Sequence, residues 1–159
     1  AVGAIDVPPD TLAGAFLAAR LVVHAQGFRV LAAASDDYGW ALDPARIARL
    51  WRAGCIIRAD LLDEIAAAFD DAPDDGELLL SPGYARQLAT HLPALRAVVG
   101  EAVRTGHAVP ALSAALGWVD TLRRGHGTAG LIQAQRDLFG HLGFERLGET
   151  GRHHGPWWG

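Results

Sequence analysis

Hydrophobic residues recur at helical spacing over most of this chain, and no stretch of useful length alternates between apolar and polar residues as a strand does. The clearest case follows a proline pair, where Asp10 or Thr11 can cap a helix. Its seam advances in steps of four and three residues through Leu12, Phe16, Ala19, Val23, Gln26 and Val30. This pattern predicts a long helix packed against other helices along that seam, with Gly27 permitting a close approach.

Prolines and small polar residues divide the rest of the chain into further helices. Asp43–Pro44 reads as an N-cap followed by a proline in the first helical position, and Val109–Pro110 opens another helix. Ser81–Pro82 and Pro93 predict two separate helix starts. We therefore expect an all-α fold, a multi-helix bundle of about six or seven helices with short connections and an extended C-terminal tail.

The segment Leu131–Gly140 has the apolar spacing of a short helix. Thr128 can cap its start through the side-chain oxygen. Gly140 can end it in a left-handed conformation, which glycine adopts without steric cost.

One arginine stands on this short helix. Arg136 follows Ile132 by four residues and precedes Phe139 by three, so we expect its stem to be packed while its guanidinium reaches an anion. The other interpretation is an ion pair with a buried carboxylate of the same chain, such as Asp137 or Glu145. The spacing alone leaves both open.

Composition narrows the class of protein and of partner. With 159 residues, 50% of them hydrophobic, the chain is long enough for one buried core. A net charge of -4 and a pI near 5.9 argue against a nucleic-acid partner, which needs a basic surface. Cys55 is the single cysteine, which favours a reducing, cytoplasmic location. No apolar run approaches the length of a membrane span, so we expect no membrane contact.

Two patterns imitate ligand sites. Gly125–Gly130 has the spacing of a dinucleotide-binding turn, but no strand precedes it, so we expect no nucleotide there. His141, His153 and His154 cluster near the C-terminus without the spacing of a common zinc site, so we expect no metal.

Two further expectations concern buried contacts. Arg58 stands beside core residues, and we expect it to form a buried ion pair with a nearby acid. The candidate acids are Asp60, Asp63 and Glu64. Trp157 and Trp158 are costly to leave in water, so we expect them to insert into a groove of their own subunit or of a partner.

Several separated segments, taken in order, carry a family resemblance. They are Ala25–Phe28 with Tyr38–Trp40, then Leu50–Arg58, and finally Leu131–Gly140 with a tail that ends His154–Trp157. Over roughly residues 16 to 159 the chain thereby resembles 6-phosphogluconate dehydrogenase, the decarboxylating enzyme of the pentose phosphate pathway.

The resemblance implies an all-helical C-terminal domain in residues 1–140 and a C-terminal tail in residues 141–159, without the N-terminal NADP-binding domain. In that family an arginine and a histidine of this region reach into the neighbouring subunit of a homodimer and hold the substrate's phosphate. The arginine corresponds to Arg136. The family's histidine position is occupied by Leu142 here, so His141, one residue earlier, is the candidate.

The resemblance also implies oxidative decarboxylation of 6-phosphogluconate to ribulose 5-phosphate with NADP. All 14 positively charged side chains of this chain are arginine, so the family's catalytic lysine is absent from it and we expect it to be inactive alone. Two alternatives remain: a non-catalytic helical dimerisation module, and the helical domain of a related hydroxyacid dehydrogenase acting on another sugar acid.

Overall fold

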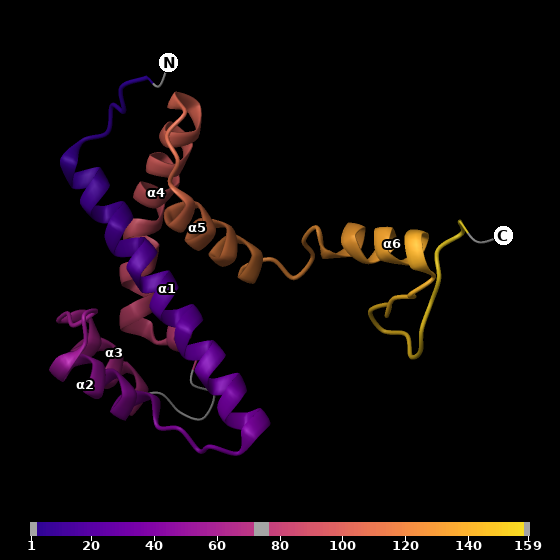
Figure 1. Cartoon of the computed structure of the whole chain (residues 1–159), viewed down its shortest axis with the longest axis horizontal. Coiled ribbons are helices and arrows are strands. Elements are labelled where there is room, and N and C mark those ends of the chain that lie inside the picture. Colours follow the sequence, from indigo (N-terminus) through magenta and orange to yellow (C-terminus); the bar gives the residue numbers. More distant parts are fainter. Residues whose placement is uncertain (1–2, 72–76, 158–159) are drawn as a thin grey trace. The chain divides into compact units, whose positions relative to one another are not determined.

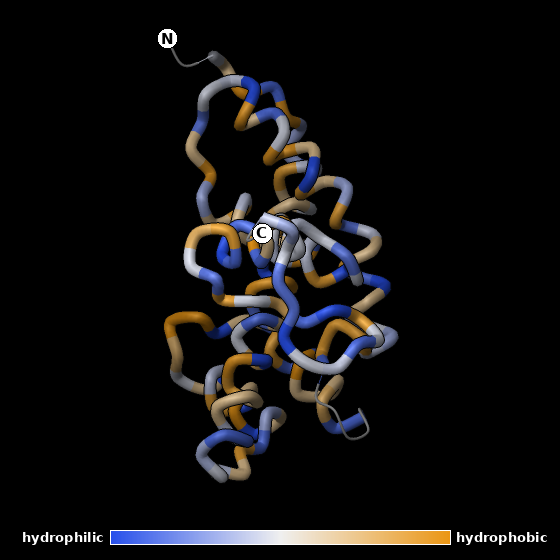
Figure 2. The backbone as a smooth tube through the Cα atoms, turned by 90° about the vertical axis from the view of Figure 1, so that its right-hand side faces the viewer, coloured by the Kyte–Doolittle hydropathy of each residue, from blue (hydrophilic) through white to orange (hydrophobic). Residues whose placement is uncertain are grey.

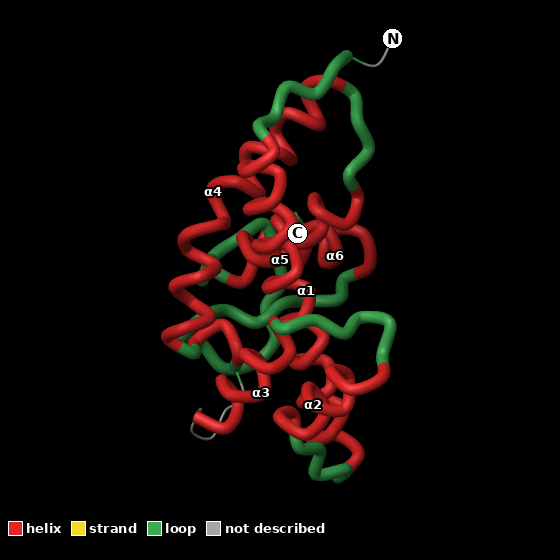
Figure 3. Tube along the Cα trace, turned by 90° about the vertical axis from the view of Figure 1, so that its left-hand side faces the viewer, coloured by secondary structure: helices red, strands yellow, loops and turns green. Residues whose placement is uncertain are grey.

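The computed structural model describes residues 3–71 and 77–157, which form six α-helices and one short 3-10 helix (Figure 1). The α-helices are α1 (Pro9–Tyr38), α2 (Pro44–Gly54), α3 (Leu61–Asp71), α4 (Pro82–Thr105), α5 (Pro110–Leu122) and α6 (Ala129–Gly140), and the 3-10 helix η1 covers Leu78–Leu80. Helices and loops account for the described part of the chain in Figure 3, apart from one isolated bridge between Phe144 and His153. The expected all-α fold is confirmed.

The chain divides into two compact units, Ala1–Val119 and Asp120–Gly159. The first holds α1 to α4 and most of α5, and the second holds α6 and the C-terminal tail. The expected boundary between a helical domain, residues 1–140, and a tail, residues 141–159, stays a prediction.

The core of the first unit lies between α1 and α4, which run antiparallel. Tyr84 at the start of α4 donates its hydroxyl hydrogen bond to the carbonyl of Leu21 at 2.7 Å, whereas Thr105 at its end accepts from the amide of Gly3 at 3.1 Å. Buried Leu95 and Val98 of α4 belong to the same hydrophobic cluster as Leu21. The two helices therefore bury one continuous apolar face between them.

The face of α1 that is buried differs from the predicted seam. Leu12, Phe16, Val23 and Val30 are each at least half exposed. The buried set is shifted along the helix surface and consists of Ala15, Ala18, Ala19, Leu21, Val22, Ala25, Phe28 and Ser35. The prediction failed because α1 carries apolar residues on two faces, and spacing alone does not say which one meets α4.

The close approach of α1 and α4 occurs at Gly14 rather than at Gly27. A β-carbon added at Gly14 would lie 3.2 Å from Cβ of Ala94 and 3.3 Å from Nδ1 of His91, whereas one at Gly27 would meet no atom within 4 Å. The residue that permits tight packing is therefore near the start of α1.

Two helix starts were expected from prolines in α4, and only one is found. The helix begins at Pro82 and continues through Pro93 to Thr105. Buried Leu88, Leu92 and Leu95 lie on both sides of Pro93, so apolar packing carries the helix across a residue that lacks an amide hydrogen. By contrast, Asp43 caps α2 as predicted, since its carboxylate accepts from the amide of Arg46 at 3.0 Å.

Among the described residues, α1 is the one helix whose length and composition would let it cross a membrane, which the sequence analysis did not anticipate. Buried core helices of soluble proteins also meet this test. One face of α1 packs against α4, and hydrophobic and hydrophilic residues are interspersed along the helices in Figure 2.

Candidate functional site

Helix α6 begins and ends differently from the prediction. Thr128 occupies the N-cap position but makes no side-chain capping hydrogen bond. Gly140 is the last helical residue, and the left-handed position falls on His141, with φ 50° and ψ 37°. The amide of His141 donates to the carbonyl of Asp137 at 2.8 Å and closes the helix there.

Asp137 is the organising residue of this unit. It is the single buried residue of α6, with 0% of its surface exposed. Its Oδ1 accepts from the amide of Gly143 and from Nδ1 of His154, both at 2.7 Å. Its Oδ2 accepts from the amide of Gly155 and from Nε1 of Trp157, both at 2.9 Å. One carboxylate thereby ties α6 to two segments of the tail, one at Gly143 and one at His154–Trp157.

These four donors decide the charge of Asp137. Burial by itself would raise the pKa of the carboxyl group, because it disfavours the charged form. The hydrogen bonds from Gly155, His154, Gly143 and Trp157 favour the carboxylate and hold its pKa well below the usual range. Since an ionised carboxylate only accepts hydrogen bonds, Nδ1 of His154 carries the proton in that contact.

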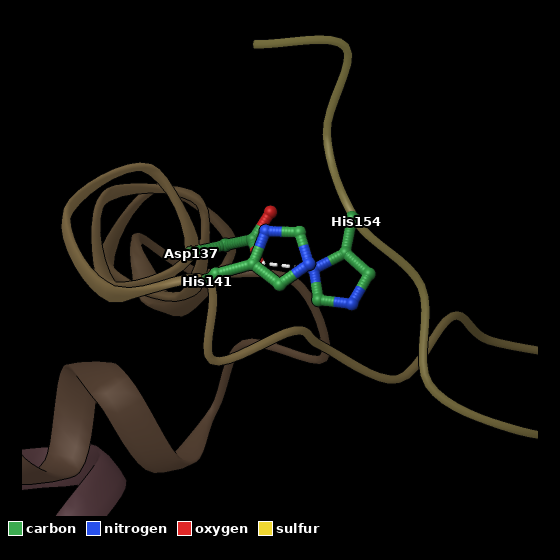
Figure 4. A group of neighbouring side chains, drawn as sticks. All are labelled: Asp137, His141 and His154. Carbon is green, nitrogen blue, oxygen red and sulfur yellow. Dashed lines mark hydrogen bonds and ion pairs between the residues drawn. The ribbon is translucent and has the colours of Figure 1, made fainter. Parts of the chain in front are cut away.

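The tail brings two histidines together over this carboxylate (Figure 4). The rings of His141 and His154 are stacked, with centroids 3.8 Å apart and an interplanar angle of 15°. His141 is exposed and His154 is half-buried. The antiparallel bridge between Phe144 and His153 pairs the returning segment of the tail with the segment that follows α6.

Asp137, His141 and His154 also offer one possible metal-ligand atom each, all within 4.8 Å of one another. Each carboxylate oxygen of Asp137 already accepts two hydrogen bonds. The two stacked imidazole rings direct their nitrogen lone pairs in roughly parallel planes and not toward one common point. A metal would have to displace these contacts and rotate the rings. The arrangement therefore fits a hydrogen-bonded network better, and the absence of a metal stays a prediction.

Arg136 is exposed, and its guanidinium donates to Oε1 of Gln133 at 3.2 Å. Within the described residues, no carboxylate forms an ion pair with it, contrary to the interpretation that Asp137 or Glu145 would neutralise it. The expected packing of its stem is also not found, since Ile132 is 52% and Phe139 is 83% exposed.

The predicted ion pair of Arg58 is wrong. Arg58 is exposed, and Arg52 takes the acids instead, with Nη2 2.7 Å from Oδ1 of Asp60 and Nε 2.8 Å from Oδ2 of Asp63. Arg52 reaches them because it lies in the last turn of α2, which packs against α3.

The insertion of Trp157 and Trp158 into a groove stays a prediction. Trp157 is 36% exposed and anchors the tail through its indole hydrogen bond to Asp137. Trp158 lies outside the described residues. Gly125–Gly130 covers the end of the loop after α5 and the first two residues of α6, and it follows a helix rather than a strand, as the sequence indicated.

Sequence reasoning missed Asp137 and His154 as partners. Asp137 was considered only as an acid for Arg136, because residues 137 and 154 are 17 positions apart and no periodicity links them. A signal was present: an acid on a helix rich in apolar residues needs hydrogen-bond donors if it is buried, and the tail offers histidines and tryptophans that can donate.

Comparisons with known proteins agree on one family. The family model described as "6-phosphogluconate dehydrogenase, C-terminal domain" matches residues 6–157. Curated relatives include the decarboxylating 6-phosphogluconate dehydrogenases of Treponema pallidum, 46% identical over 137 residues, and of Escherichia coli, 45% identical over 139 residues. These alignments cover 86% and 87% of this chain but only 28% and 30% of the relatives. The chain thus spans somewhat less than a third of their length.

A solved structure shares the fold. It is the 6-phosphogluconate dehydrogenase of Plasmodium falciparum, described in its apo form, with its cofactor NADP+ and with its substrate 6-phosphogluconate. The TM-score is 0.87 at 32% sequence identity, and the match covers 96% of this chain and 34% of that one.

Proposed function

Because this chain belongs to the 6-phosphogluconate dehydrogenase family, whose C-terminal domain it matches, we propose that it is the C-terminal part of an enzyme that converts 6-phosphogluconate to ribulose 5-phosphate with NADP. In this proposal the chain supplies dimer contacts and binds the phosphate of the substrate. The hydride and proton transfers belong to parts of the protein outside it, so the chain alone is inactive.

The exposed guanidinium of Arg136 is the observation that carries this role. A guanidinium presents paired N–H donors that match two phosphate oxygens, and its charge suits a dianionic group. Arg136 is exposed, and its recorded side-chain partner is the neutral amide of Gln133. No acid within the described chain competes with a phosphate for it.

His141 is the second group of the proposed phosphate site. It follows α6 directly, five residues after Arg136, and its ring is exposed. An imidazole N–H can donate to a phosphate oxygen in either charge state of the ring. In this proposal His141 replaces the family's phosphate-binding histidine, whose position is occupied by Leu142 in this chain.

The remaining partners follow from the same assignment. NADP would bind outside this chain. In agreement with this, Gly125–Gly130 follows a helix and not the strand that a dinucleotide-binding turn needs. We also propose that the protein is a homodimer in which the tail of one subunit reaches the partner subunit. We also propose a cytoplasmic location, although some plant relatives are named chloroplastic.

The test is calorimetric titration of 6-phosphogluconate into the full-length protein and its Arg136→Ala variant. Loss of a charge-assisted, two-pronged contact should weaken binding roughly 10- to 100-fold. Arg124→Ala is the matched control, because Arg124 is an exposed arginine in the loop before α6 and should leave the affinity unchanged. Equal affinity of the wild type and Arg136→Ala would remove Arg136 from the phosphate role.

A further inference from the structure

His141 occupies a backbone conformation that a residue with a β-carbon enters at a cost. Its φ is 50° and its ψ is 37°, the left-handed region in which helices usually end on glycine. The chain has a glycine next to it, Gly140, but uses that glycine as the last helical residue. Retaining an imidazole at the left-handed position points to a task for the side chain.

The contacts of the His141 ring form an ordered series. The His141 ring stacks on the ring of His154, with centroids 3.8 Å apart. The His154 ring is in turn held by the 2.7 Å hydrogen bond between its Nδ1 and Oδ1 of Asp137. Asp137 in turn is fully buried and held by three other donors. A rigid carboxylate thus sets the plane of the inner ring, and the inner ring sets the plane of the outer one (Figure 4).

We propose that His154, oriented by Asp137, is a positioning residue that holds the imidazole of His141 against the phosphate of the substrate. The inference rests on the proposed function, because it assumes that His141 binds phosphate. A histidine that is stacked before the ligand arrives loses less rotational freedom on binding than a free one. His141 lies one residue before the family's histidine position, which Leu142 occupies here. Stacking on His154 compensates for this shift, because it sets the direction of the His141 ring.

Titration of 6-phosphogluconate into full-length variants tests the coupling. His141→Ala and His154→Ala should each weaken binding by roughly 10-fold, and the double variant should be no weaker than either single one. KM should rise accordingly, while kcat changes little because neither ring takes part in the transfers. Additive effects in the double variant would mean that the two rings act independently and would overturn the proposal.

Two controls separate positioning from general damage to the tail. His153→Ala removes a neighbouring histidine whose ring faces Glu149, at 3.5 Å, and Trp157→Phe removes one donor from Asp137 while leaving the stacked pair. His153→Ala should keep the affinity of the wild type, and Trp157→Phe should lose less than His154→Ala, because the other three donors to Asp137 remain. A loss in Trp157→Phe equal to that in His154→Ala would assign the effect to tail folding and overturn the proposal.

The chemical shifts of the ring protons of His141 give a structural readout. Stacking on another ring at 3.8 Å displaces them, and the displacement should disappear in His154→Ala but persist in Trp157→Phe. An unchanged spectrum in His154→Ala would show that His141 is held by something else.

His141→Gly distinguishes a structural role of His141 from a binding role. Glycine suits the left-handed position, so the melting temperature should stay equal or rise. The affinity for 6-phosphogluconate should nevertheless fall as in His141→Ala. If His141→Ala and Arg136→Ala both leave the affinity unchanged, the proposed function fails. If those two matter and His154→Ala does not, only this inference fails.

Discussion

At the level of single residues, the structure of the C-terminal unit depends on the buried negative charge of Asp137. Asp137 satisfies two backbone amides, an imidazole and an indole with four hydrogen bonds. Its neighbour Arg136 points its guanidinium to solvent and Gln133. Because the buried acid is already satisfied by the tail, the adjacent arginine stays available for an external anion.

Acid should release the tail from Asp137. The folded-state pKa of Asp137 lies below its ordinary value of 3.8, so in acid the unfolded tail binds more protons than the folded one. The stabilisation is therefore complete above about pH 5 and declines as the pH falls below about 4 toward the folded pKa. The NMR signal of the Trp157 indole N–H, which is bonded to this carboxylate, should stay in place at neutral pH and shift only in that acid range.

Asp137→Asn is the control for this titration, because an amide does not ionise. The variant should lack the acid transition and show a less ordered tail at neutral pH. A transition of the Trp157 signal centred near about pH 6.5, the range of an ordinary histidine, would contradict the assignment to Asp137.

Among the secondary-structure elements, the positions of the helices follow mainly from local sequence spacing. The way the helices pack against one another does not. The start of α2 at Pro44 and the start of α5 at Pro110 were both predicted, since capping and proline geometry act locally. The buried face of α1 and the continuation of α4 through Pro93 were not, because both are decided by residues from another helix.

Glycine substitutions in α1 test which position contacts α4. Gly27→Ala should stabilise this chain by about 0.5–1 kcal/mol, because alanine favours the helix and a β-carbon there has open space. Gly14→Ala should give no such gain, since its β-carbon would lie 3.2 Å from that of Ala94. Chemical denaturation of both variants gives the comparison, and equal gains would place the helix contact elsewhere.

At the scale of the whole molecule, the chain spans somewhat less than a third of the length of its curated relatives, and it leaves apolar side chains exposed. Leu131, Phe139 and Leu147 of the second unit are each more than 60% exposed. Apolar groups in such numbers favour a protein interface. This agrees with the proposal that the unit packs on a second subunit.

The sequence motifs identified the family, because each motif is a run of consecutive residues. The phosphate-binding role of Arg136 stays a prediction. The pairing of Asp137 with His154 needed coordinates, since it joins a helix to a tail without any periodic pattern.

Phe139→Ser tests whether α6 lies in a dimer interface. Phe139 is 83% exposed here, and burying its ring against a partner would stabilise the dimer by roughly 1.5–3 kcal/mol. Its loss should therefore raise the dimer dissociation constant of the full-length protein roughly 10- to 100-fold in sedimentation experiments. Gln135→Ser, an exposed polar residue of the same helix, is the control and should leave dimerisation unchanged. Unaltered sedimentation of Phe139→Ser would place the interface elsewhere.

The most direct test compares 6-phosphogluconate with gluconate, which lacks the phosphate, as ligands of the full-length protein and of Arg136→Ala. If Arg136 grips the phosphate, the variant should lose roughly 10- to 100-fold in affinity for 6-phosphogluconate and nothing for gluconate. The preference for the phosphorylated acid would shrink by that factor. An equal loss for both ligands, or a preference that survives in Arg136→Ala, would contradict the assignment of phosphate binding to this part of the protein.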